Sequence, residues 1–346
     1  MIDPDKRSSG KNYEAWRIDQ NDFPEGGEEI DILLFFCRYA ILSASGHNSQ
    51  PWKISPGEKT ILVKINKDHY ISGEKSGLLN VEPYVSIGTF LETLTMAASG
   101  YGYDLVMKYS NNPDEVASVE LGKGQRANGN KEILGAITHR VSNRSNFARE
   151  PLSKSSILTL GAVDIKGVNL TVVEDNEHIL KLARLTESAI KNIMKHKKYR
   201  QELAEWVRNN VSKKFDGMPG FTHGVPTIPS FVAKIVIRNS ARMGPPPSRS
   251  KELMINSGAL LIVGYQKAER TNFIDLGRAY SRICINAQLL GLATSALGAA
   301  VIDAESRERV VKEFGLNYRP AFIIRVGKPT ETAAHSPRWP LSKLID

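Results

Sequence analysis

The feature that most constrains the fold is a repeat of small residues in two long apolar segments. The segments start near Val85 and Asp275, and both have the apolar spacing of a buried helix. Three pairs of small residues recur in them at a separation of 189 residues, namely Gly88 and Gly277, Ala98 and Ala287, and Gly102 and Gly291. A match at a fixed separation indicates two related halves fused head to tail. Small residues also recur wherever helices pack closely, which is the simpler alternative.

The second half is predicted to contain an insertion. Arg38 and Arg140 each lie near the end of the opening helix of their half, yet they are only 102 residues apart. The difference between the two separations, 87 residues, is therefore extra sequence in the second half. Six prolines lie between Asp216 and Arg249. So many prolines are more typical of a covering segment or an exchanged arm than of a core.

The apolar spacing predicts helices and strands in both halves. In the first half we expect a helix over residues 28–44, a hairpin over 52–66, a long helix from 85, and strands at 105–109 and 117–121. In the second half we expect a helix from 131, a strand at 170–174, mostly helix over 175–212, a strand at 258–266, a helix from 275 and a strand at 320–329.

Composition narrows the class of protein. The chain of 346 residues is 41% hydrophobic and 24% charged, and no apolar run has the length of a membrane span. The first residues lack the apolar core of an export signal, which predicts a cytoplasmic location, although a signal removed from a longer precursor would leave no trace. Cys37 and Cys284 lie in apolar helical runs and are expected in the core. The histidines show no paired metal spacing, so we expect no metal.

The net charge of +9 raises nucleic acid, acidic lipid and small anions as partners. The excess is diffuse apart from a cluster between Lys191 and Arg200, and such a cluster on a helix is most often a solvated face. No nucleic-acid-binding module with interleaved aromatic residues is visible, and such a protein would lose affinity steeply with salt. We therefore expect a small-molecule partner, and neither nucleic acid nor a membrane.

One polar loop follows the first helix. Residues 44–52, ASGHNSQPW, combine small residues, amides and an indole ring. This composition suits a loop that grips a flat polar ligand, because amides donate and accept along a heterocycle edge and small residues let the backbone approach. An ordinary polar turn closed by a buried Trp has the same composition. Ser45 has no acid and histidine in a recognisable catalytic order, so we expect no hydrolase.

Two further stretches suit an anionic ligand. Arg140, Ser142 and Arg144 supply two guanidiniums and a hydroxyl within five residues, and Arg338 adds a third guanidinium. The planar fork of arginine makes paired, charge-assisted bonds to phosphate. A solvated basic turn is the alternative. In GLATSALGAA, small residues after a helix end leave backbone N–H groups within reach of a ligand, or form only a closely packed helix end.

Taken in order, five segments resemble the nitroreductase superfamily of FMN proteins: RYAILSASGHNSQPWKI, HRVSNRSNF, GLATSALGAA, RPAFIIRVGKP and SPRWPLSKLI. The segment YRQELAEWVRNNVSKKFDGMP is similar to the Acg-like branch, in which two nitroreductase halves are fused and an inserted lid covers the flavin. The resemblance runs from about residue 30 to the C-terminus. It implies an α+β nitroreductase-like fold with halves at residues 1–125 and 126–346, each an antiparallel sheet with helices, and a lid at about 190–250.

The resemblance also implies which residues hold FMN. Those implied at the isoalloxazine ring are Ser45, Asn48, Gln50 and Trp52. Those implied at the phosphate are Arg140, Ser142, Arg144 and Arg338. Gly298 and Ala299 match the backbone stretch near flavin N5. The phosphate motif reads HRVSNR over residues 139–144, which leaves its register open by one residue.

The implied function is an oxidoreductase in which NAD(P)H reduces FMN and the flavin passes electrons to a nitro, quinone or similar acceptor. This chemistry needs positioning and electrostatics rather than a dedicated acid or base, so no catalytic side chain is assigned. One complete set of motifs implies one flavin in an internal pseudo-dimer, with the chain a monomer or a homodimer. The alternative is a flavin-binding or flavin-sequestering protein whose lid stays closed. We also expect Arg338→Ala to loosen FMN and to leave the fold intact.

Overall fold

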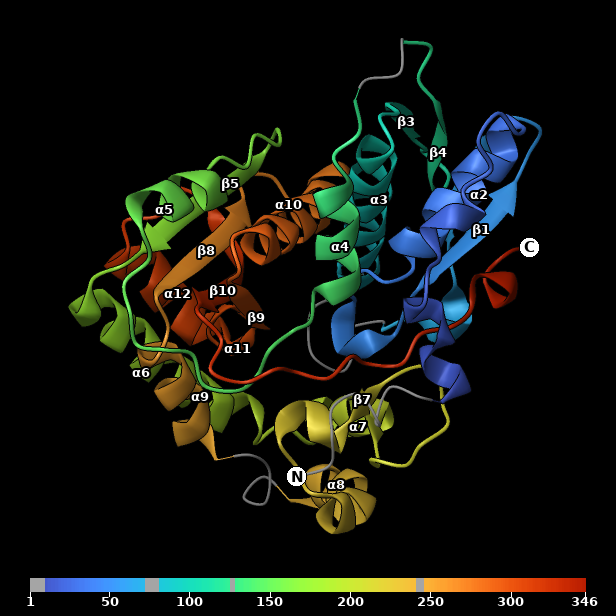
Figure 1. Ribbon diagram of the computed structural model, residues 1–346. Helices are drawn as coiled ribbons and strands as arrows, with labels where there is room; N and C mark the ends of the chain where they lie inside the picture. The colour runs from blue at the N-terminus through green and yellow to red at the C-terminus, as the bar shows by residue number, and fades with distance from the viewer. Residues whose placement is uncertain (1–9, 72–80, 125–127, 241–245) are drawn as a thin grey trace.

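The computed structural model of the 346-residue chain describes residues 10–71, 81–124, 128–240 and 246–346. Figure 1 shows two lobes, each made of a sheet with helices, and a smaller helical unit that contains α7 and α8 and lies below them. Within the described residues, no helix is long and apolar enough to cross a bilayer.

The first lobe is built on an antiparallel sheet of four strands. In spatial order these are β1 (Trp52–Pro56), β2 (Thr60–Ile65), β4 (Glu115–Leu121) and β3 (Leu105–Tyr109). The predicted hairpin and the two later strands are confirmed. Alternation of β-branched residues sets the register, because Ile54 lies opposite Val63 and both are fully buried. The helices of this lobe are α2 (Glu29–Ala40) and α3 (Glu82–Gly100), and α4 (Lys131–His139), which follows the predicted boundary of the halves, packs into the same core.

The second lobe has its own antiparallel sheet. In spatial order its strands are β5 (Val168–Val173), β8 (Ala259–Tyr265), β10 (Arg319–Gly327) and β9 (Ala293–Leu297). Its helices outside the insertion are α5 (Lys154–Gly161), α10 (Arg270–Leu289), α11 (Ala299–Ile302) and α12 (Ala304–Glu313). Every residue of β8 is buried, as its unbroken apolar run predicts. The central residues of GLATSALGAA form β9, an edge strand that pairs with β10 and was not predicted.

The two sheets share one topology. In chain order, β1, β2, α3, β3 and β4 correspond to β5, β8, α10, β9 and β10, and the spatial orders of the strands match. The lobes differ between their first two strands: residues 57–59 close the β1–β2 hairpin, whereas residues 174–258 separate β5 from β8. The extra sequence inferred from the repeat therefore lies between β5 and β8. The boundary of the halves at residue 125 stays a prediction.

The two lobes meet where α3 crosses α10. A Cβ atom added to Gly88 would overlap the carbonyl of Ile274, and one added to Gly277 would overlap the carbonyl of Val85. The contact is reciprocal, as across a two-fold axis, and both of its glycines belong to the pairs that repeat at 189 residues. Only glycine allows backbones to approach this closely. One of the three repeated pairs, Gly88 and Gly277, therefore lies at the contact between the lobes.

The insertion has a packed part and an outlying part. Its helices are α6 (Asn176–Ile193), α7 (Lys197–Trp206), α8 (Thr227–Asn239) and α9 (Pro247–Ile255). Leu182 of α6 and Met254 of α9 are fully buried in one cluster with Leu260 of β8. The helices α7 and α8 pack against each other away from both sheets (Figure 1). The outlying part of the predicted lid is thus the α7–α8 unit and the segment that joins these helices.

The C-terminal segment returns from the second lobe to the first (Figure 1). The backbone N–H of Ile54 donates to Leu344 O at 2.8 Å, and that of Asp346 donates to Ile54 O at 2.9 Å. Leu344 is fully buried in the core of the first lobe. This return brings residues 334–339 to the loop at residues 44–52.

Candidate ligand-binding site

The loop after α2 holds a strained backbone. His47, Asn48 and Gln50 have φ values of 48°, 59° and 56°, which is the left-handed region that disfavours residues with a Cβ. Such residues cost about 1–3 kcal/mol each and persist where surrounding contacts fix them. Here the backbone N–H of Gln50 donates to Ser45 Oγ at 3.0 Å. The loop is therefore held in one shape by its own hydroxyl.

The amide side chains of this loop bind backbone from the insertion and the C-terminal segment. Asn48 Nδ2 donates to Gly217 O at 3.1 Å and to Pro337 O at 2.9 Å. Gln50 Nε2 donates to Phe215 O at 2.7 Å, and Gln50 Oε1 accepts from the N–H of Trp339 at 2.9 Å. Residues 215–217 of the insertion therefore occupy the hydrogen-bonding edge that the loop offers.

A cavity of about 40 Å³ lies beside the loop. Its lining comes from both lobes, from the insertion and from the two terminal segments: Trp16, Ala44, Ser45, Asn48, Arg140, Val141, Ser142, Arg144, Met218, Thr222, Ala334, Ser336 and Arg338. None of these lining residues, all within the described ranges, carries a carboxylate. Three guanidiniums thus surround one small space without a counter-charge.

The cations of this cavity keep unused donors. Arg140 is 6% exposed, and its Nη1 has no hydrogen-bond partner among the described residues. Arg338 is 3% exposed, and its Nε likewise lacks a partner there. Burial, and then the charge of Arg140, lower the pKa of Arg338 to about 9. Burial also leads the lowering of the pKa of Arg144, with Arg140 contributing. A bound anion strongly stabilises the charged form of buried guanidiniums such as these.

Arg338 also fixes the loop. Its guanidinium donates to Asn48 Oδ1, and it reaches the carbonyls of Leu42 and Ser43, each at 3.0 Å. Its Cζ lies 4.9 Å from the centre of the Trp16 ring. The side chain therefore has a structural role beside any role toward a ligand.

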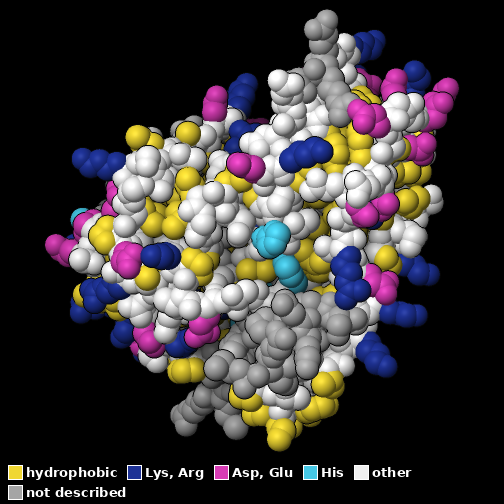
Figure 2. Space-filling view, in the orientation of Figure 1, with side chains coloured by type: hydrophobic (Ala, Val, Ile, Leu, Met, Phe, Trp, Pro, Cys, Tyr) yellow, Lys and Arg dark blue, Asp and Glu magenta, His cyan; other side chains and the backbone are white. Residues whose placement is uncertain are grey.

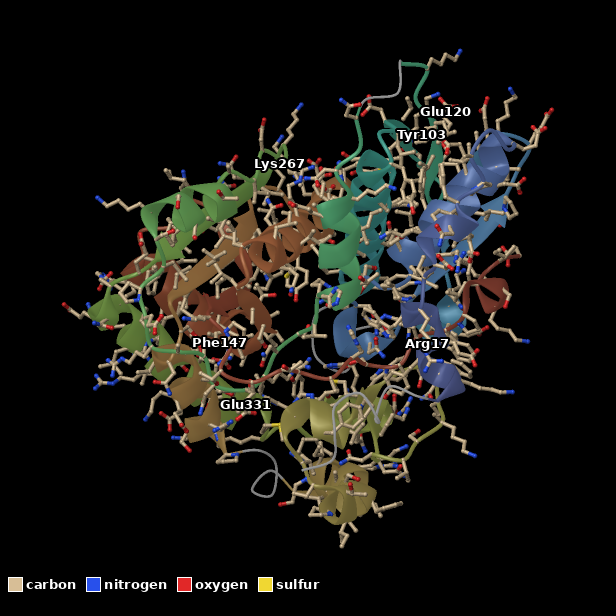
Figure 3. All side chains as sticks on the ribbon, viewed as in Figure 1. Arg17, Tyr103, Glu120, Phe147, Lys267 and Glu331 are labelled. Atoms are coloured by element: carbon tan, nitrogen blue, oxygen red, sulfur yellow. The ribbon has the colours of Figure 1, made fainter. Side chains whose placement is uncertain are left out.

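The turn that carries Arg140 and Arg144 is tied to the C-terminal segment as well. Asn143 Nδ2 donates to Glu331 O at 3.1 Å, and Phe147 forms a β-bridge with Pro329. Phe147 and Glu331 are labelled in Figure 3, in the second lobe and on the segment below it. The turn and the C-terminal segment thus reach the cavity as one unit.

Two titratable groups beside the cavity have shifted pKa values. Burial, and then the charge of Arg144, lower the pKa of His47 to about 4. Burial raises the pKa of Glu82 to about 7, although its carboxylate accepts hydrogen bonds from Ser86 and Gly46. Glu82 lies so close to Gly46 that a Cβ there would overlap its carboxylate. Glu82 was not predicted from the sequence, because its position at the start of α3 gives no signal of this proximity.

Six of the ten residues predicted to bind a cofactor line the cavity: Ser45, Asn48, Arg140, Ser142, Arg144 and Arg338. Gln50 lies behind it, and Trp52 is fully buried in the first lobe, with its ring 5.5 Å from that of Phe90. Gly298 and Ala299 begin α11 and do not line the cavity. Trp16, Met218 and Thr222 were not predicted, because nothing in their local sequence points to the loop.

Comparison with known proteins gives a consistent set of relatives. No family model matches the chain. It is 22% identical over 325 residues to the "Putative NAD(P)H nitroreductase acg" of Mycobacterium tuberculosis, covering 92% of this chain and 95% of that protein. It is 23% identical over 339 residues to an uncharacterized protein of the same organism, covering 91% and 92%.

Two solved structures overlap with part of the chain. Nitroreductase A from Vibrio parahaemolyticus is 14% identical, with 61% of this chain and 73% of that chain covered and a TM-score of 0.38. An FMN-dependent nitroreductase from Clostridium difficile is 13% identical, with 58% and 90% covered and a TM-score of 0.35.

Proposed function

We propose that this chain, which belongs to the nitroreductase superfamily and is similar to its Acg-like branch, is an FMN-dependent oxidoreductase. In this proposal NAD(P)H is the electron donor, and a nitro compound, a quinone or a similar small molecule is the acceptor. The relative with the nitroreductase name matches over almost its whole length, so the proposal concerns the entire chain and not one lobe.

The observation that carries the proposal is the group of three arginines around one cavity without a carboxylate. Arg140, Arg144 and Arg338 have the charge and the unused donors that a phosphate monoester requires. The hydroxyl of Ser142 lies on the same lining. The donor set therefore fits the phosphate end of FMN.

The ring end would be held by the loop at residues 44–52. Asn48 and Gln50 present amide groups along one edge, and Ser45 fixes their backbone. When bound, FMN supplies reversible hydride and single-electron transfer, and the contacts of the protein to the ring tune its reduction potential. The chain's own contribution is to bind, to orient and to exclude water. Glu82 adds a carboxyl that can hold a proton near neutral pH beside this loop.

The insertion must move for a large ligand to enter. A cavity of about 40 Å³ is of the order of a phosphate group, whereas sites for cofactor-sized ligands measure roughly 300–1,000 Å³. Met218 and Thr222 line the cavity, and Phe215 and Gly217 bind the loop amides. Displacement of residues 215–222 would free the loop edge and enlarge the space. This is the movement of a lid.

The same contacts favour a second candidate function, flavin binding without turnover. If residues 215–222 stay in place over the bound cofactor, a nicotinamide has no access to the ring. Either function is compatible with the proposed pseudo-dimer of two halves and one site, because the cavity lining comes from both lobes.

Visible absorbance spectroscopy separates these possibilities. The protein is purified, supplied with FMN, freed of unbound cofactor and mixed anaerobically with NADH or NADPH. We expect the visible absorbance band of bound oxidised flavin, and we expect this band to bleach with at least one nicotinamide. A bound flavin that stays oxidised would establish the second candidate. A protein without a flavin spectrum would refute both.

A further inference from the structure

Helix α8 turns its apolar face outward. Ile228, Phe231, Val232 and Ile235 are 85%, 55%, 52% and 62% exposed. Their spacing of three, four and seven residues places them on one face of a helix. These four residues are called the α8 ridge below. An amphipathic helix of a water-soluble protein normally buries this face, so four large apolar side chains in one exposed row indicate a binding surface.

The opposite face of α8 fixes this orientation. Ser230 is 2% exposed, and its Oγ accepts from the backbone N–H of Asn210 at 3.0 Å. Asn210 Nδ2 donates to Val225 O at 2.9 Å, and its Oδ1 accepts from the N–H of Phe221 at 2.7 Å. The helix is anchored through its polar side. These hydrogen bonds fix the rotation of α8 about its axis, so that the α8 ridge faces outward.

The surroundings of the α8 ridge are basic. Residues 195–239 contain nine Lys or Arg and three Asp or Glu, a net charge of +6 out of the +9 of the whole chain. Of the three acids, Glu202 is buried and Asp216 pairs with Arg208 at 2.8 Å. Helix α8 itself has Lys234 and Arg238, both exposed, and no acidic residue.

The cations lie at the edge of the ridge. At about 100° per residue, Lys234 and Arg238 fall on the same side of the row formed by Phe231 and Ile235. In Figure 2, hydrophobic side chains gather at the lower end of the molecule, over α8 as placed in Figure 1. An apolar row bordered by cations is the pattern of a helix that lies in the headgroup region of a bilayer.

We propose that the α8 ridge, with Lys234 and Arg238, docks on the surface of an anionic phospholipid bilayer. The apolar side chains enter the boundary between headgroups and acyl chains, and the cations contact lipid phosphates. Charge favours this occupant over a second copy of the chain, because two insertions of net charge +6 would repel each other across a shared face. The expectation that no membrane is a partner rested on the lack of a spanning segment, and a surface helix needs none. The inference is independent of the proposed function.

Co-sedimentation with vesicles tests this inference. The full-length protein is mixed with vesicles of phosphatidylcholine alone, or of phosphatidylcholine with about one third phosphatidylglycerol, at low and at high salt. We expect binding to the anionic vesicles only, and weaker binding as salt rises. Lys234→Gln with Arg238→Gln should reduce partitioning by about fivefold per cation. Phe231→Ser with Ile235→Ser should reduce it by about tenfold or more.

The matched control is Leu158→Ser, which removes a side chain that is 73% exposed on α5, a helix outside the insertion. It should leave vesicle binding unchanged. All these substitutions are at exposed positions. If the double variant Phe231→Ser with Ile235→Ser fails to fold, the double variant of Lys234 and Arg238, which retains the α8 ridge, still tests the proposal. Equal binding to neutral vesicles, no binding, or no effect of the α8 variants would overturn the proposal. A concentration-dependent dimer that the Phe231 and Ile235 variant abolishes, without vesicle binding, would show that a second copy is the occupant.

Discussion

Two groups of arginines with partly or fully buried side chains lie between the lobes, and they differ in one respect. At the α3–α10 crossing, Arg278 and Arg282 contact the carboxylate of Glu92 at 3.0 and 2.6 Å, and Glu92 is 1% exposed. At the cavity, Arg140, Arg144 and Arg338 have no carboxylate among the lining residues. Asp275 also lies 3.7 Å from Arg278, so two carboxylates balance the two cations of the first group. The second group retains positive charge and unused donors at some cost in stability, which is typical of a ligand site rather than of a structural ion pair.

The largest effect is expected at the paired group. Glu92→Ala leaves Arg282 without the carboxylate that it contacts and Arg278 with only Asp275, 3.7 Å away, and removal of one partner of a buried pair costs about 3–5 kcal/mol. Because the side chains of Arg278 and Arg282 are 24% and 28% exposed, we expect the lower end, a loss of about 3 kcal/mol in the free energy of unfolding. Urea denaturation measures it. A loss below about 1 kcal/mol would mean that the paired group is not structural.

One arginine variant from each group separates ligand binding from stability. Arg144→Ala removes a cation without a carboxylate, so we expect FMN affinity to fall by about 30-fold, from the loss of charge-assisted bonds of about 2 kcal/mol. The unfolding free energy of the FMN-free protein should stay the same or rise. Arg278→Ala should do the reverse, lowering stability and sparing FMN affinity. Flavin fluorescence titration measures the FMN affinity of both variants, and urea denaturation measures their unfolding free energy. If both variants change these two quantities equally, the two groups of arginines do not differ in role.

A carboxylate beside the cavity gives a smaller, pH-dependent effect. The pKa of Glu82 is raised from 4.5 to about 7, mainly by burial. A carboxyl that binds its proton more tightly in the folded state contributes stability below its unfolded pKa, and this contribution is lost as pH rises through the folded pKa. Between pH 4.5 and 7, wild type should therefore lose about 1–2 kcal/mol relative to Glu82→Gln, after allowance for partial exposure.

Urea denaturation of both proteins at several pH values measures this difference. The burial of His47 acts in the opposite direction, since its lowered pKa makes stability rise from about pH 4 to 6.5. It is present in both proteins and cancels in the comparison. Parallel pH profiles of wild type and Glu82→Gln would contradict the raised pKa.

Local patterns in the sequence predicted much of the fold. Alternating β-branched residues predicted the hairpin of the first lobe, and an unbroken apolar run predicted β8. The separation of 189 residues identified Gly88 and Gly277 as equivalent, and the structure brings their backbones into contact. The local sequence pattern did not predict β9, because small residues have little intrinsic preference for strands. These residues form a strand only by pairing with β10.

The site was harder to predict than the fold, because its contacts join distant parts of the chain. Arg338 reaches Asn48 across 290 residues, and its bonds to loop carbonyls have no signature in the spacing of residues. These bonds also alter the expectation for Arg338→Ala, which should now disturb the loop as well as loosen a ligand. For this reason Arg144, rather than Arg338, is the cleaner probe of the phosphate contact.

Arg140, Arg144 and Arg338, the group without a carboxylate, are proposed as the phosphate site of one FMN per chain. Isothermal titration of FMN into the FMN-free protein, with riboflavin as the ligand that lacks the phosphate, tests it most directly. We expect one FMN per chain, and for riboflavin an affinity lower than that of FMN by more than about 30-fold in wild type, with this ratio reduced by about 30-fold in Arg144→Ala, where Arg140 and Arg338 remain. Equal affinity of wild type for FMN and riboflavin would contradict the claim.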